Sequence, residues 1–361
     1  MKAVRLMPTT CCRYVLLWSA ISSFAPIFGQ TVGDKVLAER ENRRRDSPAQ
    51  VRQASGRPYQ DKVLSAPNPD GLDQTRGAVM TFEEYAAVPL PPMPYILVLT
   101  ADPGPLFYFG TRHTFDPNDW QIRAIEDYWH QFHPSLALNE GGDPPVLESR
   151  EAMVQRFGEA GLVRFLAKAS GIPVRSLEPP PHQERALLLT DFSVEQVKVF
   201  YVLRGVVQFR KSRNDERVEG FVERVVRGLS REPGLEGPPC SLAEFEQSYA
   251  RLFSAPPDWK VVPEDWFDPV ISRPQPYTNR LSRRLSEFRD RHMVKLLISE
   301  VKQGNRVFAV VGGSHVIMQE HALRAALASA LGPGRDRSRE RTQDMRTEHG
   351  GPPGASAGAI K

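Results

Sequence analysis

Two histidines in this chain follow the same local pattern, an apolar run that ends at a glycine three residues before the histidine. In "LFYFGTRHT" Gly110 precedes His113, and in "VFAVVGGSHV" Gly312 precedes His315. Glycine permits backbone angles and close approaches that other residues do not, so each turn can bring an imidazole to the end of a strand. Imidazole is a common metal ligand and accepts protons near neutral pH. The repeated pattern therefore predicts that His113 and His315 belong to one site.

Two glutamates also fall at the ends of apolar runs. "SLALNEGG" carries Glu140 and "IPVRSLE" ends in Glu178. Two histidines with one or two carboxylates match the ligands of a divalent metal such as Mn, Co or Zn, which acidifies a bound water and polarises a carbonyl. We predict His113, His315 and Glu140 as metal ligands, with Glu178 as a further ligand or a general base. The alternative is that the histidines are hydrogen-bonded structural residues.

A long helix expected at about residues 279–303 contributes an arginine. In "RLSEFRDRHMVKLL", Leu285, Arg289 and Met293 stand four residues apart, so Arg289 lies on the apolar stripe. Burying an unpaired guanidinium is costly. Arg289 is therefore expected either to form a structural salt bridge with Glu140 or Glu178, or to clamp a carboxylate or oxyanion. Asp290 would cap or orient it.

The elements that would position these residues alternate between strand and helix. Continuous apolar runs at 95–100 and 106–110 predict a hairpin. Further strands are expected in 135–142, ending at Glu140, and in 172–178, ending at Glu178, and a last strand is expected at 306–311. Between them lie helical patterns, including one that Asp116 would cap with Pro117 at its first position, and whose apolar stripe holds Trp120, Ile122, Ile125 and Trp129. This alternation predicts a three-layer α/β fold with a mixed central β-sheet flanked by helices.

The two ends of the chain differ in composition from the middle. Residues 1–29 combine positive charges with the apolar run "YVLLWSAISSFAPIF", which predicts a secretory signal peptide and an exported, periplasmic or secreted, bacterial protein. The alternative is an uncleaved membrane anchor. Residues 30–79 are expected to be a low-order spacer and 332–361 a disordered tail. One folded domain is expected at 80–331.

Composition removes several classes of function. Without residues 1–29 the chain has 44 basic and 43 acidic residues, so charge gives no support for nucleic-acid binding. Only Cys240 then remains of the three cysteines, which excludes an internal disulfide and a cysteine-based zinc cluster. The chain also has no G-x-S-x-G, H-E-x-x-H, P-loop or G-x-G-x-x-G motif.

These stretches, in this order, resemble the TraB/GumN/TIKI family, which is related to the erythromycin esterase/ChaN-like superfamily. The resemblance covers about residues 94–331 and rests on "YFGTRHT", "LNEGG", "GIPVRSLE", "FRDRHMVKLL" and "VFAVVGGSHV". It implies a site composed of His113, Glu140, Glu178, Arg289 and His315. Asp290 departs from the family pattern, in which many members have Asn, and this leaves the partner of Arg289 open.

The resemblance implies three kinds of function. TIKI-type members are described as metal-dependent proteases, which favours an exported metal-dependent peptidase or esterase with Arg289 stabilising an oxyanion and Gly110 and Gly312 as supporting residues. Erythromycin esterases are thought to hydrolyse esters with histidine and glutamate and no metal. ChaN binds haem, and a haem- or iron-binding protein would use the aromatic residues of the 254–277 loop as an exposed lid. The expected partner is a peptide, ester or small molecule, with membrane contact only through an uncleaved signal.

Overall fold

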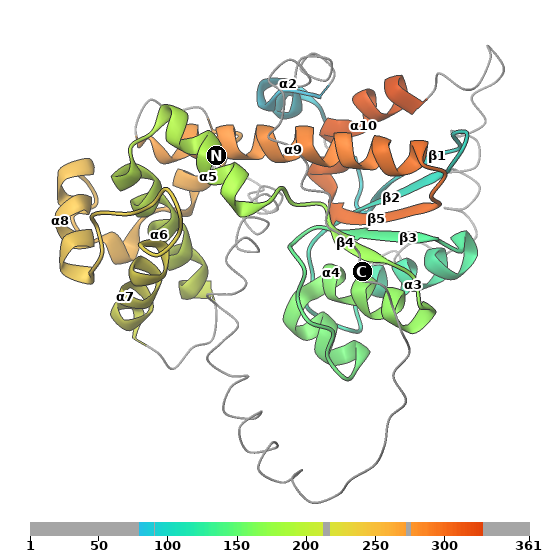
Figure 1. Cartoon of the computed structure of the whole chain (residues 1–361), viewed down its shortest axis with the longest axis horizontal. Coiled ribbons are helices and arrows are strands. Elements are labelled where there is room, and N and C mark those ends of the chain that lie inside the picture. The colour runs from blue at the N-terminus through green and yellow to red at the C-terminus, as the bar shows by residue number, and fades with distance from the viewer. Residues whose placement is uncertain (1–78, 90, 212–216, 272–275, 328–361) are drawn as a thin grey trace, which may run out of the picture. The chain divides into compact units, whose positions relative to one another are not determined.

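A computed structural model of the chain describes residues 79–89, 91–211, 217–271 and 276–327 (Figure 1). These residues form two compact units, each assembled from separate stretches of the chain. We call residues 89–139, 146–175 and 294–327 the sheet unit, and residues 79–88, 140–145 and 176–293 the helical unit, in each case for the described positions only. The expected signal peptide, the spacer up to residue 78 and the expected tail lie outside the described residues.

The sheet has five strands in the order β1-β2-β5-β3-β4. The strands are β1 (Tyr95–Leu99), β2 (Leu106–Thr111), β3 (Leu136–Asn139), β4 (Val174–Ser176) and β5 (Val307–Gly312). β1 and β2 form the expected antiparallel hairpin, whereas β2 and β3 both run parallel to the central β5. These pairings confirm the predicted mixed sheet. The sequence could predict it because buried parallel strands are continuous apolar runs.

Helices cover both faces of this sheet. On one face α3 (Trp120–Phe132) and α4 (Arg150–Ser170) bury Phe107 of β2 and Phe308 of β5, whose rings stack with centroids 5.0 Å apart. Tyr108, the next residue of β2, must face the other way, because successive side chains of a strand alternate. Its hydroxyl donates to Gln319 of α10 (Gly313–Leu327) over 2.9 Å, so α10 covers the second face.

The helical unit comprises α2 (Phe82–Ala87), α5 (Pro181–Asp191), α6 (Val194–Lys211), α7 (Val218–Leu229), α8 (Leu242–Leu252), the short 3₁₀ helices η4 (Trp259–Val261) and η5 (Glu264–Phe267), and α9 (Thr278–Lys302) as far as residue 293. Its core is built largely from α6 and α7, whose apolar faces meet. The described part of the 254–277 loop, residues 254–271 and 276–277, contributes aromatic side chains to this core. The idea of an exposed aromatic lid is wrong, since Trp259, Trp266 and Phe267 are all buried in it.

The first helix of the sheet unit begins later than expected. The cap of α3 is Asp119, whose carboxylate accepts from the Gln121 N–H at 2.9 Å, and not Asp116. Asp116 instead accepts from the Asn118 N–H and forms a turn before the helix. As a consequence Trp120 becomes the first helical residue and is 52% exposed, so its expected place on the buried stripe is wrong.

Other boundaries shift by a few residues. β3 and β4 are shorter than predicted, so Glu140 follows β3 directly and Glu178 lies two residues beyond β4. α10 begins immediately after β5, which places His315 in its first turn. In the part of the chain that the structure describes, we find no helix with the length and apolar character needed to span a membrane.

Candidate functional site

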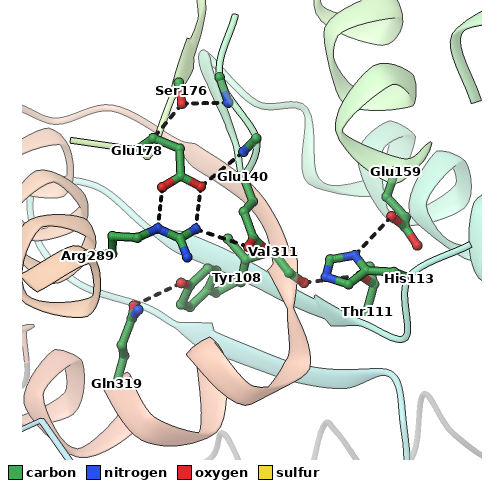
Figure 2. Close-up of polar contacts among 12 residues, drawn as sticks. Tyr108, Thr111, His113, Glu140, Glu159, Ser176, Glu178, Arg289, Val311 and Gln319 are labelled. Atoms are coloured by element: carbon green, nitrogen blue, oxygen red, sulfur yellow. Dashed lines mark hydrogen bonds and ion pairs between the residues drawn. The ribbon is translucent and has the colours of Figure 1, made fainter. Parts of the chain in front are cut away.

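His113 lies just beyond β2 and is held by a carboxylate from α4. Its Nδ1 lies 3.4 Å from Oε2 of Glu159, while Oε1 of the same carboxylate accepts from the Thr114 N–H at 2.6 Å (Figure 2). Both carboxylate oxygens therefore fix the short segment that carries the imidazole. Because the Glu159 side chain is only 6% exposed, this contact is shielded from bulk water. In the tautomer that has the proton on Nδ1, this nitrogen donates to Glu159 and Nε2 is the basic nitrogen of the ring.

A kink in α4 brings Glu159 to this position. Gly158 has φ +59° and ψ −145°, a conformation that is essentially restricted to glycine. A Cβ atom there would lie 3.0 Å from the Thr114 carbonyl oxygen and 3.5 Å from the Phe115 ring. The backbone of α4 therefore passes close to the segment that follows His113, and the next residue, Glu159, reaches that segment with its carboxylate.

His315 comes from the strand next to β2. β2 and β5 pair in parallel, with Gly110 opposite Val311 and Thr111 opposite Gly312, so the chain leaves both strands at the same edge of the sheet. A Cβ atom on Gly110 would lie 2.8 Å from the Cα of Gly313. The close approach expected of this glycine is thus present, and it lets α10 begin against β2. His315 is buried.

In the helical unit, Arg289 of α9 binds two carboxylates (Figure 2). Its Nε and Nη2 donate to the two oxygens of Glu178 at 2.6 and 2.5 Å, and Nη2 also lies 3.3 Å from Oε1 of Glu140. The turn after β3 supports this arrangement, since the Gly141 N–H donates to Glu178 at 3.2 Å. Ser176 accepts from the Glu178 N–H at 3.0 Å. The structural salt bridge proposed for Arg289 is confirmed.

Burial makes these charges strongly dependent on one another. The side chain of Arg289 is 1% exposed, and those of Glu140 and Glu178 are 6% and 5% exposed. Burial alone lowers the pKa of Arg289, but the charges of Glu178 and Glu140 outweigh burial and hold the pKa above its ordinary value. Nearby, burial and then the charge of Arg289 lower the pKa of Arg204 to about 10. Arg289 is therefore a permanent cation.

The predicted site residues fall into two groups. Glu140, Glu178 and Arg289 are in contact within the helical unit, whereas His113 and His315 follow neighbouring strands of the sheet unit. Asp290, the residue that follows Arg289 in the sequence, is also buried, with 1% of its surface exposed.

The donor set gives limited support to a metal. Within the described ranges, His, Cys, Asp and Glu side chains form no group of three or more that could hold an ion. Glu140, the predicted carboxylate ligand, is instead bound to Arg289. The three-ligand site of His113, His315 and Glu140 therefore stays a prediction.

Sequence reasoning missed Glu159. The residue is 46 positions from His113 and lies within a helical pattern, where a glutamate is ordinarily a solvated side chain. The available signal was Gly158 in the middle of "VQRFGEAGLV", because a glycine inside a helix often marks a bend or a close approach. Comparison with protein-family models, curated proteins and solved structures finds no match to this chain.

Proposed function

We propose that the protein is an exported hydrolase of esters or amides in which His113 activates water. The single observation that carries the proposal is the contact between His113 Nδ1 and Glu159, in a protected position just beyond a central strand. A buried carboxylate on one ring nitrogen fixes the tautomer and ring orientation and stabilises the imidazolium ion, which makes the other nitrogen a positioned general base.

In the proposed reaction, Nε2 of His113 takes a proton from water as the water oxygen attacks the substrate carbonyl. The carbonyl π electrons move to oxygen and give a tetrahedral oxyanion. Collapse of this species breaks the bond to the leaving alkoxide or amine, which receives the proton from the His113 imidazolium. Water is consumed, and the acid and the alcohol or amine are released. Glu159 keeps its charge throughout and neutralises the transient imidazolium.

The second candidate is the metal-dependent hydrolase. Two points favour it. Metal-ligating histidines also place their second ring nitrogen on a carboxylate, as His113 does with Glu159. In addition, His315 follows β5, which pairs with β2, the strand that precedes His113. His113 and His315 would hold the ion, which would supply an acidified water and a polarised carbonyl. Haem binding loses the exposed aromatic lid on which that alternative relied.

The decisive experiment measures metal content and ester hydrolysis on the same preparations of wild type, His113→Ala, His315→Ala and His321→Ala. His321 is an exposed histidine of α10 and serves as the matched control. Metal-free catalysis predicts turnover that survives exhaustive chelation and is lost in His113→Ala. About one equivalent of Mn, Co or Zn per chain, lost in both His113→Ala and His315→Ala together with activity, would favour the metal-dependent reaction instead. Activity retained in His113→Ala would refute both the metal-free and the metal-dependent reaction.

A further inference from the structure

The segment that carries His113 also displays two exposed aromatic residues. Among the described residues the large apolar side chains with marked exposure are Val88, Phe115, Trp120 and Val261, and the two aromatic ones both lie within seven residues of His113. Phe115 is 37% exposed and Trp120 is 52% exposed. Exposed aromatic residues gathered beside a functional group are typical of a binding surface.

These aromatic side chains stand on an ordered piece of backbone. The buried side-chain amide of Gln121 binds both backbone groups of Arg112, accepting from its N–H at 2.9 Å and donating to its carbonyl at 3.0 Å. The start of α3, and with it Trp120, is thereby fixed to the His113 segment. The Phe115 ring lies over Gly158, at the kink that delivers Glu159. Rigid aromatic side chains bind at a low cost in conformational entropy.

The charges of this segment select the kind of group that would bind. Arg112 and Arg123 are balanced by Asp116 and Asp119 between positions 112 and 123. Arg112 and Asp119 also approach each other, with Nη2 and Oδ2 3.6 Å apart. With no net charge to attract an ion, the surface suits a neutral group whose apolar area would be removed from water on contact.

We infer that Trp120 and Phe115 form a specificity surface that receives an aromatic or large apolar side group of the substrate, next to the bond that His113 hydrolyses. The inference rests on the proposed function for the reaction, but not for the binding itself. It names the substrate class as esters or amides of aromatic or bulky apolar acids, in preference to small ones. In a hydrophobic pocket one methylene changes kcat/KM by about tenfold to two-hundredfold, so we expect contact with a whole aromatic group to change it at least about tenfold.

The test compares N-acetyl-L-phenylalanine ethyl ester with N-acetylglycine ethyl ester in the full-length protein. We expect the phenylalanine ester to be favoured by at least about tenfold in kcat/KM. Trp120→Ala should reduce this ratio to about threefold or less, and Trp120→Tyr should restore most of it. Val261→Ala, which removes an equally exposed apolar side chain from the helical unit, should leave the ratio unchanged. An unchanged ratio in Trp120→Ala would overturn the inference.

A binding measurement separates this inference from the proposed reaction. Trp129, Trp259 and Trp266 are buried, so the difference in acrylamide quenching between wild type and Trp120→Phe reports Trp120. N-acetyl-L-phenylalaninol, which has no ester, should protect Trp120 from acrylamide in both wild type and His113→Ala. Protection without hydrolysis of either ester would refute the reaction and retain the surface. Ester hydrolysis without protection of Trp120 from acrylamide would refute the surface. Protection that depends only on protein concentration would also refute it, because that result indicates that a second copy of the chain covers Trp120.

Discussion

Replacing Arg289 with Met removes a cation that binds both Glu140 and Glu178, at almost unchanged side-chain volume. At an effective dielectric constant of about 20, one charge pair at about 4 Å is worth about 4 kcal/mol. Arg289 makes two contacts to Glu178 and one to Glu140, all of them shielded from solvent. Removing one partner of a buried pair typically costs about 3–5 kcal/mol, because a charge stays buried without compensation. We expect that loss in the free energy of unfolding.

Urea unfolding followed by circular dichroism and tryptophan fluorescence measures this cost. The matched control is Arg227→Met, which breaks the pair between Arg227 and Glu223 on the surface of α7, where the Arg227 side chain is 64% exposed. Surface pairs of this kind contribute about 0.3–0.5 kcal/mol. Both arginines belong to the helical unit, so the same unfolding transition reports both variants.

A double-mutant cycle identifies the source of the effect. If the cost arises from an uncompensated Glu178, adding Glu178→Gln to Arg289→Met should recover at least about 1.5 kcal/mol relative to the sum of the single changes. A loss of less than about 1 kcal/mol in Arg289→Met, or strictly additive changes, would refute the reasoning.

The local structure supports three further predictions. Glu159→Gln should lower kcat at least about tenfold, because a partner that orients a functional histidine typically contributes a factor of that size to activity. Unchanged steady-state kinetics would show that Glu159 takes no part in the reaction of His113. Gly158→Ala should destabilise the protein by at least about 1 kcal/mol more than Gly171→Ala. Both glycines have positive φ, but an added Cβ meets the Thr114 carbonyl oxygen at 3.0 Å at Gly158 and no atom within 4 Å at Gly171. Equal urea midpoints for the two variants would contradict this prediction. Burial raises the pKa of Tyr249 from 10.0 to about 12. The stability that its neutral phenol contributes is therefore complete below pH 10 and is lost as pH rises towards about 12. Tyr249→Phe should make the alkaline fall in the free energy of unfolding shallower, and an identical pH profile would exclude Tyr249 as the cause of that fall.

The sequence was most informative where the physical signal is local and repeated. Continuous apolar runs predict the central strands, because a strand buried on both faces must be apolar throughout. The pattern of Ser193 followed three residues later by Gln196 predicts a capping box. Both contacts are present, since the Ser193 N–H donates to the Gln196 side chain at 3.0 Å and the Gln196 N–H donates to the Ser193 hydroxyl at 3.2 Å. The inward position of Arg289 and its pairing with glutamate also followed from a four-residue spacing and the cost of burying a charge.

Prediction failed where two local alternatives have similar energies. Asp116 and Asp119 are both good helix caps, and the choice depends on where Gln121 must lie to bind the backbone of Arg112. Likewise, the proline-rich stretch around Trp259 has the composition of an exposed loop. It is buried because α6 and α7 leave an apolar face that this stretch covers. Neither choice can be made from a short window of sequence.

The pairing of His113 with Glu159, on which the proposed function rests, depends on backbone geometry more than on residue type. Chemistry was expected of the two glutamates that follow strands, yet Glu140 and Glu178 are both bound to Arg289. The carboxylate that contacts His113 comes from the middle of a helix, and it does so because Gly158 adopts a conformation available only to glycine. Glu140 and Glu178 thus contact Arg289 within the helical unit, whereas the kink of α4 brings Glu159 to His113 within the sheet unit. For this reason we propose Glu159 as the residue that orients His113.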